Sequence, residues 1–545
     1  MGPSNQPSNQ PSNQISNQIS GTQLRVGEAI IDLLAREYGV DVVFGIPGVH
    51  NIELYRGLHR SGVRAVSPRH EQGAGFMADG WSIITGRPGV CVLISGPGIT
   101  NVMTPIAQAY HDSRAMFVLA STTPTNALGK SFGPLHDLPD QATLVRSICA
   151  FSETVTDVTQ LPALIERAWN VFTSARPRPV HIAIPMDVLE QSCEPFARVH
   201  TSVNRPTPDA QDINDAIEIL NSAINPVIIA GGGAIDASAQ LVALAETLDA
   251  PVLLTGNAKG TMSSSHPLCA SNCLVFGRVQ RDVEAADVVI VIGSELSDTD
   301  LYNNGRALNF AGKVLRIDID HEQLTRRTTP TIGLVGDATL TLQSLISSLK
   351  PRGHNDGQTR AHAWREHART KTNKTFVPWL TAIETELPAN AIVALDSTQL
   401  GYSAHWWLPA VQSRSWLAPY GFGTLGCALP MAIGASVAAP SRPVLVIAGD
   451  GGWLFTVAEM AAAVDLNCNI VFVLWDNHGY EQIRDSFDDV KAPQMGVDVS
   501  SHDPVMIARG FGWTAIDAIS PEQFSKLLRA AFASGGPQFI RVRVK

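Results

Sequence analysis

Short apolar runs closed by glycine or proline are the feature that most constrains the fold of this chain. Val42–Phe44 precedes Gly45-Ile46-Pro47-Gly48, and Val90–Ile94 precedes Ser95-Gly96-Pro97-Gly98. Successive apolar positions indicate strands that are buried on both faces, and helical stretches separate the runs. The pattern predicts an α/β fold of doubly wound parallel sheets, with helices on both sides of each sheet.

The apolar runs fall into three groups, and polar segments at 203–212 and 350–360 separate them. A chain of 545 residues has room for three domains of ordinary size. We therefore predict domains at 21–195, 205–350 and 361–545. Residues 1–20 repeat Ser-Asn-Gln four times, and we expect them to form a disordered leader. Further strands are predicted at Pro226–Ala230, Val288–Ile292, Val314–Ile319, Ile392–Leu395, Val444–Ile447 and Val471–Leu474.

Composition narrows the classes of partner. The formal charge of −10 and the lack of any Lys/Arg-rich run argue against a nucleic-acid partner. The longest apolar stretches have the length of a strand, so we expect no membrane segment. Seven scattered cysteines without a CxxC pair indicate neither a disulfide framework nor a zinc site, and they fit a reducing cytoplasm.

Two polar turns at the ends of predicted strands carry the strongest chemical signal. Gly449-Asp450-Gly451-Gly452 follows one strand, and Asp476-Asn477-His478-Gly479-Tyr480 follows another. The carboxyl ends of parallel strands share one edge, where helix N-termini and glycine-lined NH groups favour a phosphate. Carboxylate and amide oxygens suit Mg²⁺, so the turns predict a magnesium ion that bridges to a diphosphate.

Together the two turns resemble the cofactor-binding motif of thiamine-diphosphate enzymes. The resemblance implies that Asp450, Asn477 and the Gly479 carbonyl ligate Mg²⁺. It also implies cofactor contacts from Gly449, Gly451, Gly452, Asn477, Gly479 and Tyr480. The family usually has Asn-Asn where this chain has Asp476-Asn477, and the replaced asparagine is the one that is not a ligand.

Other segments resemble further loops of this family. In Arg69–Ala74, Glu71 corresponds to the acid that hydrogen-bonds the aminopyrimidine ring, where an oriented acid/base group contributes about 10²–10⁴ in rate. Taken alone, Glu71 is also explained as an acid favoured at a helix start. Gly421–Gly426 is similar to the segment that wedges an apolar side chain, here Leu425, beneath the cofactor. Cofactor-facing positions in the matching loops are Pro47, Gly48, Asn51, Gly98, Asn101, Ser397, Thr398, Gln399 and Gly423.

The matches run from about residue 23 to the C-terminus in the family's order of pyrimidine-binding, central and diphosphate-binding domains. In this family Glu71 of one subunit meets the diphosphate site of another. The resemblance therefore implies a catalytic dimer, commonly doubled to a tetramer, with active sites at the subunit interface.

The expected substrate is a small 2-oxo acid. The chain looks most similar to acetolactate-synthase-type enzymes, and within them to 2-ketoarginine (5-guanidino-2-oxopentanoate) decarboxylases, through Leu135–Gln141 and Asp396–Gln399. Typical acetolactate synthases carry Phe-Gln-Glu-x-Asp near the first segment, which places His136 on their Phe and Asp137 on their Gln. Asp137 could pair bidentately with a guanidinium, or it could be a solvated loop residue. His136 is our candidate proton donor.

The sequence alone leaves three questions open. Acetolactate-type carboligation of pyruvate competes with decarboxylation to an aldehyde, and a non-catalytic relative that only binds the cofactor is a candidate of another class. Gly231-Gly232-Gly233, with Asp318 and Asp320 after later strands, is compatible with FAD in the central domain, although such a turn is usually only a turn.

Overall fold

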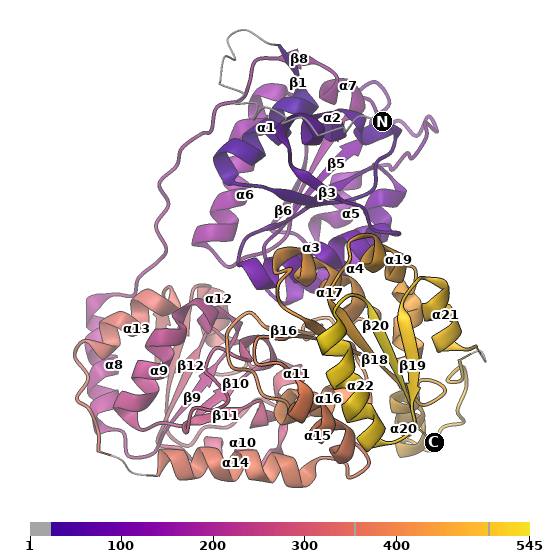
Figure 1. Cartoon of the computed structure of the whole chain (residues 1–545). Coiled ribbons are helices and arrows are strands. Elements are labelled where there is room, and N and C mark those ends of the chain that lie inside the picture. Colours follow the sequence, from indigo (N-terminus) through magenta and orange to yellow (C-terminus); the bar gives the residue numbers. More distant parts are fainter. Residues whose placement is uncertain (1–22, 354–355, 500–501, 545) are drawn as a thin grey trace, which may run out of the picture.

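The computed structural model describes residues 23–353, 356–499 and 502–544. Three six-stranded sheets form three domains, and every strand pair inside these sheets is parallel (Figure 1). A short antiparallel pair, β1 (Leu24–Arg25) with β8 (Ser192–Cys193), adds to the N-terminal domain. The α/β fold class is thereby confirmed, whereas the predicted leader at 1–20 lies outside the described residues.

The N-terminal sheet is covered on both faces. Val42 and Phe44 enter one buried cluster, and Val43 between them enters the other. The strands, in sheet order, are β3 (Arg64–Val66), β2 (Val42–Phe44), β4 (Gly89–Leu93), β5 (Met116–Thr122), β7 (Val180–Pro185) and β6 (Phe151–Thr154). The helices are α1 (Val26–Tyr38), α2 (Ile52–Ser61), α3 (Glu71–Thr85), α4 (Pro97–His111), α5 (Gln141–Arg146), α6 (Leu161–Ser174) and α7 (Met186–Leu189).

The C-terminal sheet repeats the strand order of the N-terminal sheet. Its strands, in sheet order, are β16 (Trp416–Leu417), β15 (Ile392–Leu395), β17 (Val444–Gly449), β18 (Ile470–Asp476), β20 (Gln538–Arg543) and β19 (Thr514–Ala518). Its helices are α15 (Val377–Glu386), α16 (Gln399–Trp407), α17 (Ala428–Ala438), α18 (Asp450–Trp453), α19 (Glu459–Asp465), α20 (Glu481–Asp489), α21 (Pro504–Gly510) and α22 (Pro521–Ser534).

The central sheet has a different strand order, that of dinucleotide-binding folds. Its strands, in sheet order, are β11 (Cys269–Ser271), β10 (Val252–Leu254), β9 (Pro226–Ala230), β12 (Val288–Ile292), β13 (Lys313–Asp318) and β14 (Ile332–Val335). Its helices are α8 (Ala210–Ser222), α9 (Ser238–Leu248), α10 (Gly277–Glu284), α11 (Asp298–Leu301), α12 (His321–Thr325) and α13 (Ala338–Ile346). Helix α14 (Gly357–Lys371) buries Ala361, Trp364 and Ala368 in the central core.

The glycine-rich turns of the sequence lie at the switch point of each sheet, where the chain leaves neighbouring strands in opposite directions. Such points are the usual ligand sites of open α/β sheets. In the N-terminal domain they are the turns after β2 and β4, in the central domain those after β9 and β12, and in the C-terminal domain those after β15 and β17. The fold therefore predicts up to three ligand sites.

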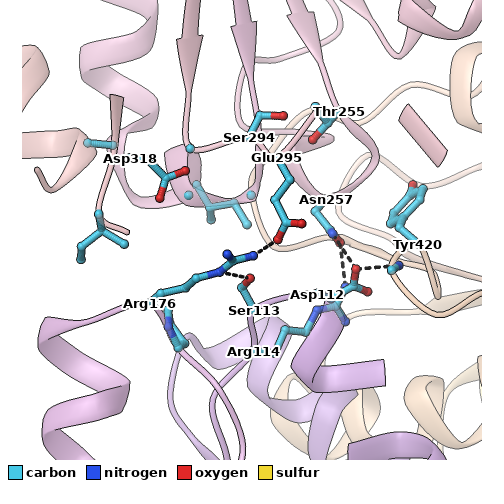
Figure 2. A pocket seen from close by; sticks show the side chains of 18 of the residues that line it. Asp112, Ser113, Arg114, Arg176, Thr255, Asn257, Ser294, Glu295, Asp318 and Tyr420 are labelled. Atoms are coloured by element: carbon cyan, nitrogen blue, oxygen red, sulfur yellow. Dashed lines mark hydrogen bonds and ion pairs between the residues drawn. The ribbon is translucent and has the colours of Figure 1, made fainter. Parts of the chain in front are cut away.

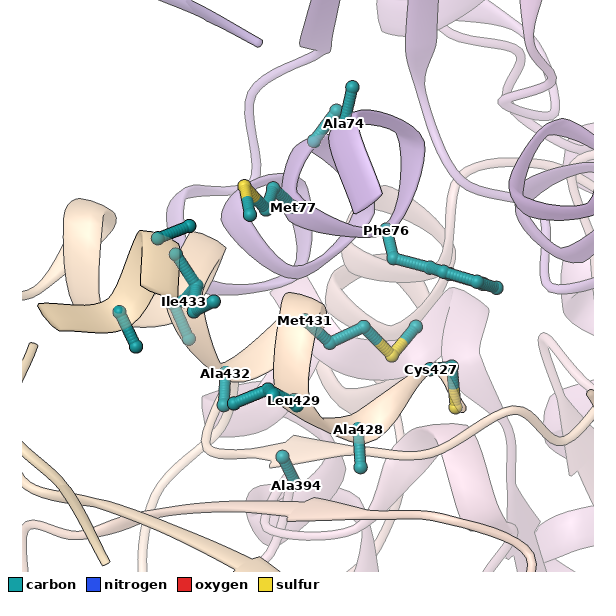
Figure 3. Packing of buried hydrophobic residues seen from close by; sticks show 14 of the residues in the cluster. Ala74, Phe76, Met77, Ala394, Cys427, Ala428, Leu429, Met431, Ala432 and Ile433 are labelled. Atoms are coloured by element: carbon teal, nitrogen blue, oxygen red, sulfur yellow. The ribbon is translucent and has the colours of Figure 1, made fainter. Parts of the chain in front are cut away.

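The N- and C-terminal domains of one chain share a buried core. Helices α3 and α17 cross so closely that a Cβ on Gly80 would lie 2.1 Å from the Met431 carbonyl oxygen, and one on Gly434 would lie 1.9 Å from that of Met77 (Figure 3). This contact holds the start of α3, at Glu71, in a fixed relation to the C-terminal domain. Across the described residues, no helix is both long and apolar enough to cross a membrane.

Candidate functional site

Asp450, Asn477 and Gly479 lie together at the carboxyl ends of β17 and β18. Gly479 N–H donates to Asp450 Oδ2 at 2.7 Å. The amide end of Asn477 lies 2.9 Å from the Gly479 carbonyl oxygen and 3.2 Å from Asp450 Oδ1. With its nitrogen turned inward the amide donates to both oxygens, and with its oxygen turned inward three oxygens converge on one point. This donor set could hold a hard cation such as Mg²⁺.

Burial shapes the electrostatics of this cluster. Asp450 is only 2% exposed, and burial together with the charge of Asp476 raises the pKa of Asp450 to about 6. A bound cation would favour the ionised form of such a carboxylate. Gly479 has a φ of 148°, and a Cβ on it would meet the Val497 carbonyl oxygen at 2.3 Å, so only glycine fits there.

Two glycines let side chains approach the backbone of the Gly449–Gly452 turn closely. A Cβ on Gly451 would lie 2.5 Å from the Tyr480 ring, and one on Gly452 would come within 3.5 Å of Leu425 Cδ2. Tyr480 and the partly buried Leu425 therefore both lie against the Gly451-Gly452 backbone. The side chain that the sequence analysis expects beneath the cofactor thus lies beside the turn that it expects to hold the diphosphate, and both roles stay predictions.

Asp396 organises the next loop, although we had not named it among the site residues. Its buried carboxylate accepts hydrogen bonds from Ser397 N and Gly426 N, both at 2.8 Å, and burial raises its pKa to about 6. Ser397 Oγ lies 3.5 Å from the Gly423 carbonyl oxygen. The side chain of Gln399 makes a different contact: its amide donates to Asp485 at 2.8 Å.

The N-terminal candidates gather at the switch point of their own sheet. Asn101 Nδ2 in α4 donates to Glu71 Oε2 at 2.9 Å, which orients the carboxylate at the first residue of α3. The buried Asn51 accepts from Gly48 N at 2.9 Å and closes the Pro47-Gly48 turn. Gly48 and Gly98 both pack against the side chain of Ile94.

His136 reaches the same edge, together with a histidine that the sequence analysis missed. The rings of His136 and His50 lie edge to face with centroids 5.0 Å apart, and His50 Nδ1 shares a hydrogen bond with Ser95 Oγ. His136 Nδ1 and Asp137 Oδ1 are buried and have no hydrogen-bond partner within the described residues. Two buried polar atoms without hydrogen-bond partners therefore lie next to each other in sequence in the loop between β5 and α5.

Glu459 and Asp112 connect the two terminal domains. Glu459 Oε1 accepts from Arg69 N and His70 N, each at 3.0 Å, just before Glu71. Asp112 Oδ1 accepts from Gly421 N at 2.8 Å and from Asn257 Nδ2 at 2.9 Å, which joins all three domains next to the Leu425 loop (Figure 2). Within the described parts of one chain, no hydrogen bond or ion pair joins the Glu71–Asn101 pair to the Asp450 cluster.

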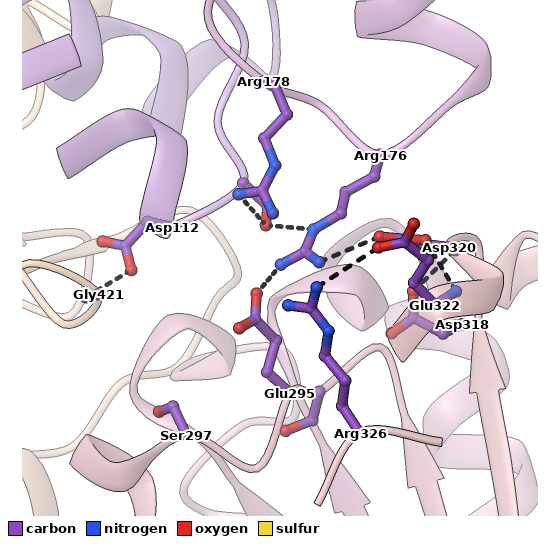
Figure 4. Close-up of polar contacts among 12 residues, drawn as sticks. Asp112, Arg176, Arg178, Glu295, Ser297, Asp318, Asp320, Glu322, Arg326 and Gly421 are labelled. Carbon is purple, nitrogen blue, oxygen red and sulfur yellow. Dashed lines mark hydrogen bonds and ion pairs between the residues drawn. The ribbon is translucent and has the colours of Figure 1, made fainter. Parts of the chain in front are cut away.

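A cavity of about 500 Å³ lies between the domains at the switch point of the central sheet. Gly232, Gly233 and Asp318 line it, and burial raises the pKa of Asp318. Arg176 of the N-terminal domain extends across to the central domain, where it pairs with Glu295 and with Asp320 at 3.2 Å (Figure 4). The cavity is large enough for a small cofactor. Asp112 and Gly421 line it, whereas neither the Glu71–Asn101 pair nor the Asp450 cluster does.

Comparisons with known protein families agree with this arrangement. Residues 24–144 match the thiamine pyrophosphate enzyme N-terminal TPP binding domain, residues 213–345 match the central domain, and residues 396–542 match the C-terminal TPP binding domain. Thiamine pyrophosphate is another name for thiamine diphosphate. The three matches fall on the three sheets in the predicted order.

Curated relatives align over almost the whole chain. The probable 2-ketoarginine decarboxylase AruI of Pseudomonas aeruginosa is 40% identical over 95% of this chain and 94% of its own length. A probable acetolactate synthase large subunit of Methanocaldococcus jannaschii is 30% identical over 95% of this chain and 92% of its own length. The acetolactate synthase isozyme 1 large subunit of Escherichia coli is 28% identical over 95% and 93% respectively.

Proposed function

Because this chain belongs to the thiamine-diphosphate enzyme family, we propose that it decarboxylates a cationic 2-oxo acid, 5-guanidino-2-oxopentanoate, to an aldehyde and CO₂. The single observation that carries the substrate class is Asp137 Oδ1, a buried carboxylate oxygen with no partner within the described residues. The name of the Pseudomonas relative points to the same substrate.

The C-terminal domain would hold the cofactor through Mg²⁺. Asp450 Oδ1, an inward-facing Asn477 Oδ1 and the Gly479 carbonyl would supply three oxygen ligands, because the amide end of Asn477 lies 2.9 Å from the Gly479 carbonyl oxygen and 3.2 Å from Asp450 Oδ1. The turn at Gly449–Gly452 would receive the diphosphate, and Leu425 would support the ring system above it. When bound, thiamine diphosphate supplies the carbon nucleophile and the electron sink for loss of CO₂.

Glu71 would exchange a proton with the aminopyrimidine ring. Asn101 occupies Oε2 of its carboxylate, which leaves Oε1 for the ring. The backbone contacts of Glu459 fix the start of α3, so that the carboxylate is oriented before the cofactor arrives.

We also propose that two copies of the chain complete the site, as a dimer or a dimer of dimers. Glu71 and the Asp450 cluster are bound into separate local networks in one chain, and a second copy could place its Glu71 over the first copy's diphosphate turn. Light scattering combined with mixed Glu71→Gln and Asp450→Asn subunits tests this proposal. Recovery of about a quarter of the activity in the mixture is expected from random dimers, whereas no recovery contradicts shared sites.

Substrate comparison tests the proposed reaction. With Mg²⁺ and thiamine diphosphate supplied, we expect aldehyde from 5-guanidino-2-oxopentanoate at far higher kcat/KM than from pyruvate or 2-oxoisovalerate. Asp137→Asn should lower kcat/KM for the guanidino acid about 10–100-fold, because a charge-assisted pair becomes a neutral hydrogen bond. The same variant should change kcat/KM for 2-oxoisovalerate less than threefold, and an equal loss on both acids would contradict the role of Asp137.

Carboligation of pyruvate is the second candidate, and the acetolactate synthase relatives favour it. Acetolactate as the main product would replace the decarboxylase proposal. FAD in the central cavity stays a further prediction: the cavity volume and the partly buried Asp318 support it, but the ion pairs of Arg176 would have to open. A flavin absorbance spectrum of the purified protein tests it.

A further inference from the structure

His50 and His136 form a pair that the proposed function does not yet use. His50 belongs to the turn after β2 and is 7% exposed, and His136 belongs to the loop between β5 and α5. Their ring centroids are 5.0 Å apart at an interplanar angle of 60°. Two loops that are far apart in the sequence therefore bring two imidazoles together at the switch point of the N-terminal sheet.

Local structure holds the ring of His50 and the backbone of His136. Ser95 Oγ shares a hydrogen bond with His50 Nδ1, and Ser95 N–H in turn donates to Ser121 Oγ at 3.2 Å. His136 has a φ of 62°, which is uncommon for a residue with a side chain. Gly96 makes room for it, because a Cβ at Gly96 would lie 2.7 Å from the His136 carbonyl oxygen. The His136 backbone therefore adopts a left-handed conformation packed directly against Gly96.

The other histidines near the site have local partners. His70 Nδ1 accepts from Gln72 N at 3.2 Å and caps α3. His111 stacks on Phe422 with centroids 5.3 Å apart, and the side chain of His478 is 78% exposed beside Asp476. By contrast, His136 Nδ1 is buried with no hydrogen-bond partner within the described residues. The His50–His136 pair thus has the strongest claim to a proton-transfer role.

The closeness of the two imidazoles disfavours a second positive charge on the pair. Burial and the neighbouring His136 lower the pKa of His50. Two imidazolium ions 5.0 Å apart would repel each other in a partly buried site, so the doubly protonated state is disfavoured.

We propose that His50 and His136 act as one proton-donating pair that completes the formation of the aldehyde. This inference rests on the proposed decarboxylation. The N–H bond of an imidazolium breaks, its electron pair stays on the nitrogen, and the proton forms a C–H bond at the carbon that has lost CO₂. Water then returns a proton to the pair, so no oxidant or reductant is consumed.

An artificial electron acceptor separates the proton-transfer step from the loss of CO₂. We compare His50→Asn, His136→Asn and the control His59→Asn, which changes an exposed histidine on α2. Both pair variants should lose aldehyde release at least tenfold, since a positioned acid contributes about 10²–10⁴. CO₂ release coupled to reduction of ferricyanide should stay within about threefold of the unmodified protein, as should every activity of His59→Asn.

A second readout needs no cofactor. In the cofactor-free protein, imidazole NMR should show the pKa of His50 below its ordinary value, and this pKa should rise in His136→Asn because a neighbouring positive charge is removed. Aldehyde release that survives in both pair variants would overturn the inference alone. If the unmodified protein releases CO₂ from none of the 2-oxo acids, the proposed function itself is overturned.

Discussion

Gly434→Ala tests the close crossing of α3 and α17 on which the geometry of the site depends. The new Cβ would lie 1.9 Å from the Met77 carbonyl oxygen, and atoms of the Met77 backbone would be its nearest neighbours. Because backbone cannot rotate away as a side chain does, the helices must separate by about 1.5 Å to restore an ordinary contact. The perturbation falls in the buried cluster that the two terminal domains share.

We expect this overpacking to destabilise the protein by about 3 kcal/mol, the upper part of the usual range, because both helices are held by the surrounding core. The unfolding midpoint in urea should fall accordingly. Affinity for thiamine diphosphate should also weaken, since α17 directly follows the Gly423–Gly426 loop. Tryptophan fluorescence follows both unfolding and cofactor binding.

Gly510→Ala is the matched control. Gly510 closes α21, and a Cβ there meets nothing within 4 Å, so the substitution should leave stability unchanged or raise it by up to about 1 kcal/mol. A Gly434→Ala protein that unfolds at the same urea concentration as the unmodified protein would refute the reasoning from the helix crossing.

Three further predictions concern single carboxylates. Glu71→Gln should reduce CO₂ release at least tenfold while cofactor affinity changes little, and a variant that keeps more than a tenth of the rate would reject its assignment. Asp450→Asn should raise the Mg²⁺ concentration required for cofactor binding at least tenfold in a fluorescence titration, and an unchanged requirement would remove Asp450 from the metal site. Burial raises the pKa of Glu459 from 4.5 to about 7, so the folded state binds this proton more tightly than the unfolded chain does. This group therefore contributes about 3 kcal/mol to the free energy of unfolding below about pH 4.5, and the contribution is lost as the pH rises through 7. Urea midpoints of Glu459→Gln, which keeps an acceptor for Arg69 N and His70 N, should lack this decline, and an identical pH profile would contradict it.

The sequence predicts strand cores better than strand ends. Pro226–Ala230, Val288–Ile292 and Ile392–Leu395 occur as predicted, because turn residues bound each apolar run sharply. The strand predicted at Val444–Ile447 continues to Gly449, since ladder hydrogen bonds with β18 extend beyond the apolar residues. Helix α14 begins at Gly357, inside the predicted polar connection at 350–360, because its few buried residues pack on the central domain. The domain bounds themselves stay predictions.

The candidate site was likewise only partly predictable from the sequence. Asp450, Asn477 and Gly479 could be brought together from sequence, because strand ends of one parallel sheet meet at one edge. Glu459 could not be found in this way, since its contact with Arg69 joins segments 390 residues apart and belongs to no recurring motif. His50 was missed for the same reason: only the folded loops bring its ring to His136.

The most direct test of the central claim is CO₂ release from 5-guanidino-2-oxopentanoate by protein stripped of cofactor and metal. We predict no release from the stripped protein, and stoichiometric CO₂ and aldehyde only after thiamine diphosphate and Mg²⁺ are both restored. Cofactor binding without CO₂ release from this acid, from pyruvate or from 2-oxoisovalerate would contradict the claim that the chain is a 2-oxo acid decarboxylase.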